Sequence, residues 1–136
     1  MSNNSYQLPD IGRLKKELRK QWDLYRHGTL DDWHEAFSNG VCFYPQIQHQ
    51  MIADKDVLGL IAFVKYWDLV PAERLFMIRK GLTEMAGAYL QQRSLGKQCL
   101  DLVKNSRFTK DFILQHADKL TKDAILFCVN SRHITF

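Results

Sequence analysis

The same helix start occurs twice in the C-terminal part of the sequence. Phe-Thr-Lys-Asp-Phe-Ile-Leu at 108–114 is followed by Leu-Thr-Lys-Asp-Ala-Ile-Leu at 120–126. A threonine that precedes an acidic first turn and an apolar run is typical of the N-terminal cap of a helix. The repeat therefore predicts two short helices in succession, and it favours folds that place similar helices side by side.

The repeat extends backwards through nearly half of the chain. Residues 69–132 divide into five units of 12 or 13 residues, each headed by Leu or Phe: 69–81, 82–94, 95–107, 108–119 and 120–132. A unit of this length fits a short helix and a tight connection, and two units form an α-hairpin repeat of about 25 residues. A solenoid-like array and an irregular bundle of similarly capped helices are both consistent with this pattern. A leucine-rich repeat is a weaker alternative, indicated by Leu100, Leu102 and Asn105.

The N-terminal half carries helix signals of a different kind. Apolar residues three or four positions apart predict an amphipathic helix over 10–27, which Gly28 ends. Thr29 is a cap for a short acidic helix. Residues 57–67 are apolar nearly all round, which predicts a helix buried in the middle of a domain. The intervening run 41–44 precedes a proline, so we expect a buried loop there. The glutamine-rich segment 46–53 gives no clear signal for its secondary structure.

These signals predict an all-α protein with N-terminal amphipathic helices and a C-terminal array of short antiparallel helices. We expect a flexible tail at 1–8 and a single helical domain at 9–136. The sequence has 46% hydrophobic residues and three prolines, a composition typical of an ordered globular domain. The three cysteines are widely spaced, which argues against a disulfide framework. The N-terminus does not resemble a signal peptide. No apolar run is long enough to span a membrane. We therefore expect a cytoplasmic location and no membrane association.

No catalytic or cofactor motif is visible. Cys99, His116, Cys128 and His133 are the residues from which a zinc site would be assembled, but their spacing does not match the close ligand pairs of compact zinc sites. Scattered glycines provide no phosphate-binding loop. We expect no enzymatic activity, no cofactor and no metal.

Protein binding is the function that this architecture favours most. Stacked short helices create extended surfaces without catalytic residues, so we predict a non-enzymatic adaptor, inhibitor or regulator of a larger assembly. Trp22 and Trp67 lie on apolar stripes and are expected in the core, whereas Trp33 on the acidic helix is expected to be partly exposed. The last helix presents an apolar face that needs cover. The candidate partner-binding residues are Trp33, Leu126, Val129 and Phe136.

Nucleic-acid binding is the leading alternative. The net charge is +4 and basic residues cluster on the first helix and at the ends of the repeat units, as expected for a surface that follows phosphates. The candidate residues are Arg13, Lys16, Lys20, Arg79, Lys80, Lys104 and Arg107. Acidic residues are interleaved with them, so an ordinary solvated surface is the competing interpretation. The pattern predicts neither the identity of a partner nor an oligomeric state.

Overall fold

The structure, a computed structural model, describes residues 11–131, and over this range the chain is helical with no strand. The predicted all-α class is confirmed. The helices are α1 (Ile11–His27), α2 (Leu30–Ser38), α3 (Pro45–Ala53), α4 (Val57–Tyr66), α5 (Pro71–Arg79), α6 (Thr83–Leu90), α7 (Cys99–Lys104), α8 (Lys110–Gln115) and α9 (Lys122–Asn130). Single 3₁₀ turns lie at Gly96–Gln98 and Ala117–Lys119.

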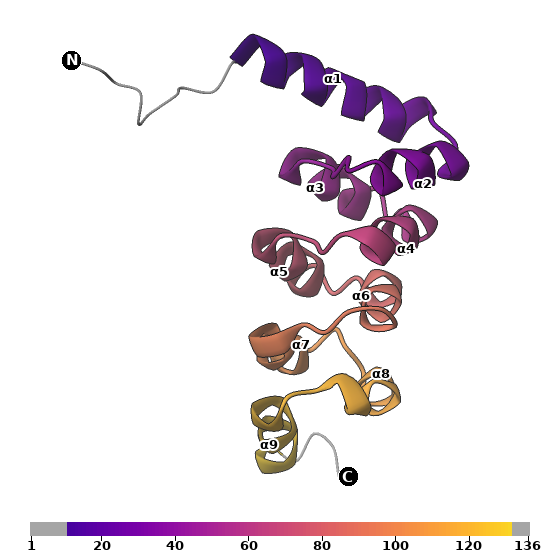
Figure 1. The fold of residues 1–136 in the computed structure, drawn as a ribbon. Helices are drawn as coiled ribbons and strands as arrows, with labels where there is room; N and C mark the ends of the chain where they lie inside the picture. Colours follow the sequence, from indigo (N-terminus) through magenta and orange to yellow (C-terminus); the bar gives the residue numbers. More distant parts are fainter. Residues whose placement is uncertain (1–10, 132–136) are drawn as a thin grey trace, which may run out of the picture.

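The helices from α2 onward alternate between two columns (Figure 1). One column contains α3, α5, α7 and α9, and the other contains α2, α4, α6 and α8. Within a column, each helix packs on the next one, as α3 does on α5 and α4 on α6. The five units predicted over 69–132 correspond to α5, α6, α7, α8 and α9, so each unit supplies one helix and two units supply one layer.

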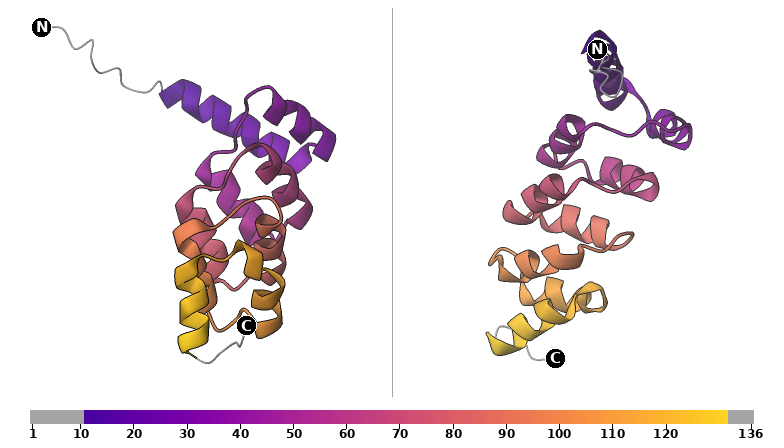
Figure 2. Two further views of the ribbon diagram at one scale, coloured as in Figure 1. Left: turned by 60° about the horizontal axis from the view of Figure 1, so that its bottom comes forward. Right: turned by 60° about the vertical axis from the view of Figure 1, so that its left-hand side comes forward.

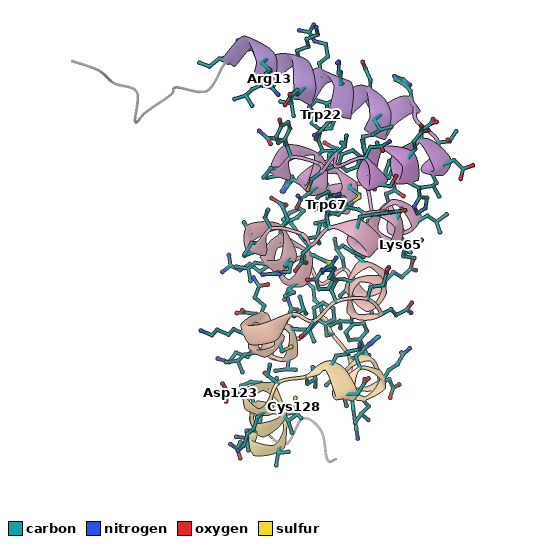
Figure 3. The ribbon with its side chains drawn as sticks, in the orientation of Figure 1. Arg13, Trp22, Lys65, Trp67, Asp123 and Cys128 are labelled. Carbon is teal, nitrogen blue, oxygen red and sulfur yellow. The ribbon has the colours of Figure 1, made fainter. Side chains whose placement is uncertain are left out.

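The long helix α1 closes one end of the stack. It lies across α2 and α3, and the remaining layers follow in chain order away from it (Figure 2). Trp22 is on the side of α1 that faces the stack (Figure 3). Gln21 links α1 to the segment before α3: its side-chain amide donates to the Cys42 carbonyl (2.9 Å) and accepts from the Tyr44 amide (2.8 Å).

The predicted threonine caps are present. The side chains of Thr29, Thr109 and Thr121 accept hydrogen bonds from backbone amides in the first turns of α2, α8 and α9. At α2 the cap is reciprocal, since the Asp32 carboxylate accepts from the Thr29 amide at 2.9 Å. Asp56 caps α4 through the Gly59 amide.

Three helices end in the same way. The residue after the cap has a positive φ at Gly40 (97°), Lys55 (56°) and Gly81 (64°), which follow α2, α3 and α5. In each case two backbone amides return to carbonyls of the last turn, the pattern of a Schellman motif. Lys55 is therefore a lysine at a position where its two counterparts are glycine.

The core is richest in aromatic residues where α1, α2 and α4 meet. Trp33, Phe37 and Phe43 are buried and pack edge-on, with ring centroids 5.0 to 6.2 Å apart. The exposure predicted for Trp33 is wrong: its side chain is 3% exposed, and its indole donates to the Leu24 carbonyl at 2.9 Å. Trp22 and Trp67 are partly buried and pack against this core.

Two further predictions are corrected by the structure. Helix α4 is not buried all round, because Leu58 is 66% and Ile61 37% exposed. The leucine-rich alternative is wrong, since Leu100 and Leu102 belong to helix α7 and no described residue forms a strand. The run 41–44 is the predicted loop with Phe43 buried, and the ambiguous segment 46–53 lies in α3.

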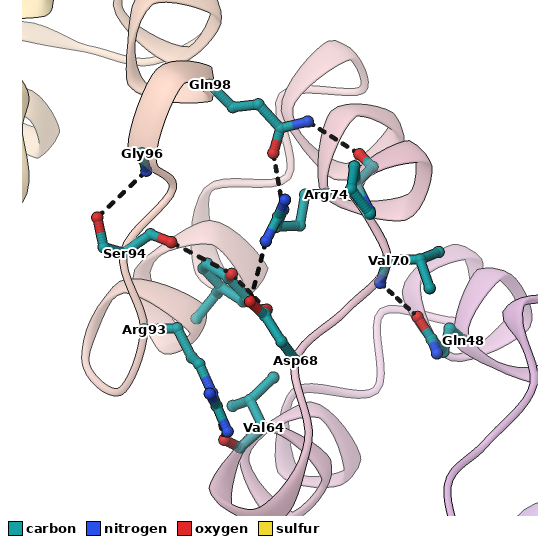
Figure 4. A network of polar contacts seen from close by, with 11 residues as sticks. Gln48, Val64, Asp68, Val70, Arg74, Arg93, Ser94, Gly96 and Gln98 are labelled. Atoms are coloured by element: carbon teal, nitrogen blue, oxygen red, sulfur yellow. Dashed lines mark hydrogen bonds and ion pairs between the residues drawn. The ribbon is translucent and has the colours of Figure 1, made fainter.

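Polar side chains hold neighbouring layers together (Figure 4). Gln48 is buried; it donates to the Phe43 carbonyl and accepts from the Val70 amide, as Gln21 does one layer earlier. Asp68 accepts hydrogen bonds from Arg74 and from Tyr89. Burial and this bond to Asp68 raise the pKa of Tyr89. These contacts belong to the fold, so Arg74 is not free to act in binding.

Candidate binding surfaces

An open groove runs across the outer side of the α4, α6 and α8 column. It has a volume of about 350 Å³ and is lined by Val57 and Ile61 of α4, Gly87 and Ala88 of α6, and Phe112 and His116 at α8. Thr83, Glu84, Gln91 and Gln115 add polar groups to the lining. We call this the α6 groove. Three separate helices contribute to it, so it exists only in the stacked fold.

The groove is hollow because α6 presents small residues at its centre. A Cβ atom at Gly87 would lie 3.5 Å from His116 Nε2 and 3.5 Å from Phe112 Cε2, which is ordinary van der Waals contact. Gly87 has no positive φ and lies inside a helix, where glycine is about 0.5–1 kcal/mol less favourable than alanine. Neither backbone geometry nor crowding therefore requires glycine here.

His116 lies in the groove without a polar partner. Its residue is 8% exposed, and its ring packs on Phe112 with centroids 4.6 Å apart. Within residues 11–131 the imidazole makes no hydrogen bond, and its ring nitrogens are open to solvent, since the buried unpartnered polar side-chain atom of this range is Trp67 Nε1. The groove therefore offers an unused hydrogen-bonding group beside an apolar wall.

Two exposed apolar side chains lie on α4, and one of them lines the same groove. Leu58 and Ile61 are one turn apart on α4, and Ile61 is itself part of the lining. Lys65, one further turn along, lies on the outer side of α4 (Figure 3). The exposed apolar surface of α4 therefore continues into the groove rather than standing alone.

A second surface lies where α3, α5 and α7 end. Lys55 and Gly81 line one shallow depression, and the Arg107 side chain covers Gly81 so closely that a Cβ there would lie 2.5 Å from Arg107 Cβ. Arg107 also donates to the Lys80 carbonyl at 2.9 Å, and Asn105 donates to the Ile78 carbonyl at 2.7 Å. We call this surface the basic edge; it consists of Lys55, Arg79, Lys80, Lys104 and Arg107.

In the described part of the chain, no carboxylate forms an ion pair with the cations of the basic edge. The ion pairs among residues 11–131 are Arg13–Glu17, His49–Glu73 and Arg74–Asp68, and none involves the edge. Lys80 Nζ lies 5.9 Å from the centre of the Phe76 ring, and Lys104 Nζ lies 5.5 Å from that of Phe127. Cations at helix C-termini also stabilise the helix dipole by about 0.3–1 kcal/mol each. These weak contacts leave the charges exposed to solvent.

The seven cations predicted for nucleic-acid binding fall into two groups. Arg107 reaches the Lys80 carbonyl and Asn105 reaches the Arg79 carbonyl, so residues 79–80 and 105–107 lie side by side at the basic edge. Lys104 ends α7 directly before them. Arg13, Lys16 and Lys20 belong to the first half of α1, where Glu17 bonds to Tyr44, at the start of α3. Asp54, at the other end of α3, bonds to Tyr25. The two basic groups therefore lie toward opposite ends of α3.

Within residues 11–131, the cations of the α1 group, unlike those of the basic edge, include one that is paired with a carboxylate. Arg13 pairs with Glu17 at 3.1 Å, and hydrogen bonds from Tyr44 and Arg13 lower the pKa of that glutamate. Lys16 and Lys20 are exposed. Lys20 lines a cavity of about 460 Å³ between α1 and residues 40–44, together with Glu17 and Cys42. A carboxylate thus lies within this group of cations.

The candidate protein contacts have three different outcomes. Trp33 is buried and is not available to a partner. Leu126 and Val129 are each 48% exposed on α9, while Ala124 and Cys128 of the same helix are buried. Phe136 lies outside the described residues. The apolar face predicted for the last helix is therefore divided, with one half packed in the core and the other exposed.

The thiols are poor candidates for chemistry. Cys99 and Cys128 are buried, and burial raises the pKa of both thiols. Cys99 Sγ lies 3.5 Å from the Lys119 carbonyl. No group of three metal-binding side chains occurs in the part of the chain that the structure describes, and His133 lies outside it.

The α6 groove is the feature that the sequence did not indicate. Two residues could have pointed to it: a glycine inside one helical unit and a histidine at the end of another. Each has several ordinary explanations, so neither predicts a groove. No helix within residues 11–131 combines the length and apolar character needed to cross a bilayer. The chain matches no family model, and comparisons with curated proteins and with solved structures give no match either.

Proposed function

We propose that this chain is a non-enzymatic protein-binding module that holds a segment of its partner in the α6 groove. The observation that carries the proposal is the unpartnered His116 in a groove of mixed apolar and polar lining that includes the exposed Ile61, one turn from the exposed Leu58. Contiguous exposed apolar surface is typical of interaction sites. Stacked helical repeats offer such surfaces without catalytic residues.

The lining indicates what kind of segment would fit. Val57, Ala88 and Phe112 favour an apolar side chain, and His116 favours a hydrogen-bonding group placed next to it. Gln91 and Gln115 offer amide groups to the backbone of an extended segment. The partner would therefore present a short peptide with one apolar anchor flanked by polar groups.

This binding mode suits an adaptor, inhibitor or regulator, because each of these roles requires recognition without chemistry. The exposed Leu126 and Val129 on α9 are a second apolar contact for a large partner. The cytoplasmic location stays a prediction from the sequence.

Selection of a random peptide library on the purified chain tests the proposal. Selected peptides are then measured against Gly87→Leu, whose side chain fills the groove from a position where the backbone accepts any residue. We expect peptide affinity to fall at least about tenfold, the effect of losing about 1.4 kcal/mol. Thermal unfolding of the variant checks that the fold is retained.

Leu126→Ser combined with Val129→Ser is the matched control, because it removes exposed apolar area outside the groove. Selected peptides should bind this control as they bind the wild type. If the selected peptides bound Gly87→Leu as tightly as the wild type, the groove would not be their binding site. The same conclusion would follow if their binding were lost only in the α9 double variant.

A further inference from the structure

We infer that the basic edge is a separate site for the phosphate backbone of a nucleic acid. The inference rests on cations that do not line the α6 groove, although Val57, Thr83 and Glu84 line both the groove and the depression beside Lys55. Of the seven cations predicted from the sequence, the inference keeps the four at the edge. It adds Lys55, which the sequence did not single out.

The first argument is the arrangement of charge. Lys55 and Gly81 follow equivalent helix ends and line one depression, and the Arg107 side chain lies over Gly81, so cations from successive layers meet here. Arg79 and Lys80 precede Gly81, and Lys104 precedes Arg107 by three residues. Successive layers of packed helices are about 8–10 Å apart. The result is a row of positive charge along the stack rather than a pocket for one anion.

The second argument is that these charges are unused. None of the five forms an ion pair within residues 11–131, although Arg13 and Arg74 elsewhere on the chain do. The nearest carboxylates in the sequence are Asp54 and Asp56, which accept hydrogen bonds from other groups, and Glu84 and Asp101. Glu84 lines the same depression as Lys55, but none of the four forms an ion pair with the edge. Unpaired cations bind polyanions with release of counterions, which favours association at low salt.

The third argument is the conformation of Lys55. Its φ of 56° lies in the left-handed region, which the equivalent positions Gly40 and Gly81 reach without a side chain. The backbone thus gives no reason for a lysine, so what this residue contributes is its side chain. That side chain extends the row of charge by one layer beyond α5.

A phosphate backbone fits this surface better than a nucleobase does. The edge presents isolated cations, and its aromatic rings at Phe76 and Phe127 lie beneath Lys80 and Lys104. Contacts of this kind position nucleic acid but do not read its sequence. We therefore expect binding without strong sequence preference.

Fluorescence anisotropy with a labelled short DNA duplex tests the inference. The wild type should bind at low salt, with log K falling against log salt with a slope of about −4 for four to five phosphate contacts. Arg79→Glu combined with Lys80→Glu should weaken binding at least about tenfold at about 50 mM salt. Lys55→Gly should weaken it about threefold and raise the thermal midpoint, which separates the lost charge from any loss of folding.

Lys16→Glu combined with Lys20→Glu is the matched control, since it makes the same change in net charge on α1. It should change the affinity less than about twofold. Equal loss in both double variants would overturn the inference, because net charge or α1 would then explain binding. Poly-glutamate of matched charge is the second probe: if it binds as tightly as the duplex, the edge recognises acidic protein and the assignment to nucleic acid fails. Absence of duplex binding at low salt would overturn it as well.

Discussion

The α6 groove and the basic edge are made by different columns of the same helical stack, and they differ in chemistry. The groove is formed by α4, α6 and α8, whose exposed residues include Leu58 and Ile61, whereas the cations of the edge lie where α3, α5 and α7 end. Val57, Thr83 and Glu84 line both the groove and the depression beside Lys55, so the two surfaces adjoin. Each helix buries one side against its neighbours and leaves the other side unconstrained by packing. A two-column stack therefore presents different chemistry on adjoining surfaces.

Each surface also contains one residue that local backbone energetics disfavour. Gly87 weakens a helix whose geometry accepts alanine, and Lys55 holds a left-handed conformation that suits glycine. The groove gains space from the missing side chain, and the edge gains charge from an added one. Of the two, only Lys55 has a strained backbone, and strain of this kind is often found at functional sites.

The largest effect is expected at the core on which both surfaces depend. Trp33→Ala should lower the free energy of unfolding by about 3–5 kcal/mol, because it removes a large buried ring and leaves the Leu24 carbonyl without its indole donor. Denaturant titration followed by circular dichroism measures this loss. A change below about 1 kcal/mol would show that Trp33 is exposed, as the sequence suggested, and that the described core is wrong.

The next largest effect is expected at Gly59 of α4, which lies in the same column of helices as Gly87. Gly59→Ala should destabilise the fold by about 1–3 kcal/mol, because the new Cβ would lie 2.8 Å from Trp33 Cζ3 and would also meet the Asp56 carboxylate that caps α4. The same denaturant titration measures it. If Gly59→Ala were neutral, the packing of α2 on α4 would be looser than described.

The smallest effect should have the opposite sign. Gly87→Ala should stabilise the fold by about 0.5–1 kcal/mol, since its Cβ fits at ordinary contact distance and alanine favours the helix. It should weaken peptides selected on the groove by less than Gly87→Leu does, because it fills less space. A loss of stability would show that the groove is already filled by neighbouring side chains.

The sequence predicted most helices because their signals are local. Thr29, Thr109 and Thr121 each cap a helix within three residues, so short-range pattern was sufficient. The exposure of Trp33 was predicted wrongly because burial depends on α1 and α4, which are distant in sequence. Leu58 and Ile61 were expected to be buried for the same reason: nothing in α4 itself tells which side lacks a neighbour.

The binding surfaces were predictable only in part. Four of the edge cations lie at ends of repeat units, and the repeat placed them together. Lys55 precedes the repeat units and was missed, although the Schellman geometry makes it equivalent to Gly81. The groove arises from Ile61, Gly87 and His116 on three helices, and their proximity follows from stacking that no local pattern specifies.

The independence of the two surfaces is tested most directly by measuring both ligands on both variants. A peptide selected on the groove and a labelled DNA duplex are titrated against the wild type, against Gly87→Leu and against Arg79→Glu combined with Lys80→Glu. We expect Gly87→Leu to lose the peptide and keep the duplex, and the double variant to lose the duplex and keep the peptide. Loss of both ligands in either folded variant would contradict two separate surfaces on one stack.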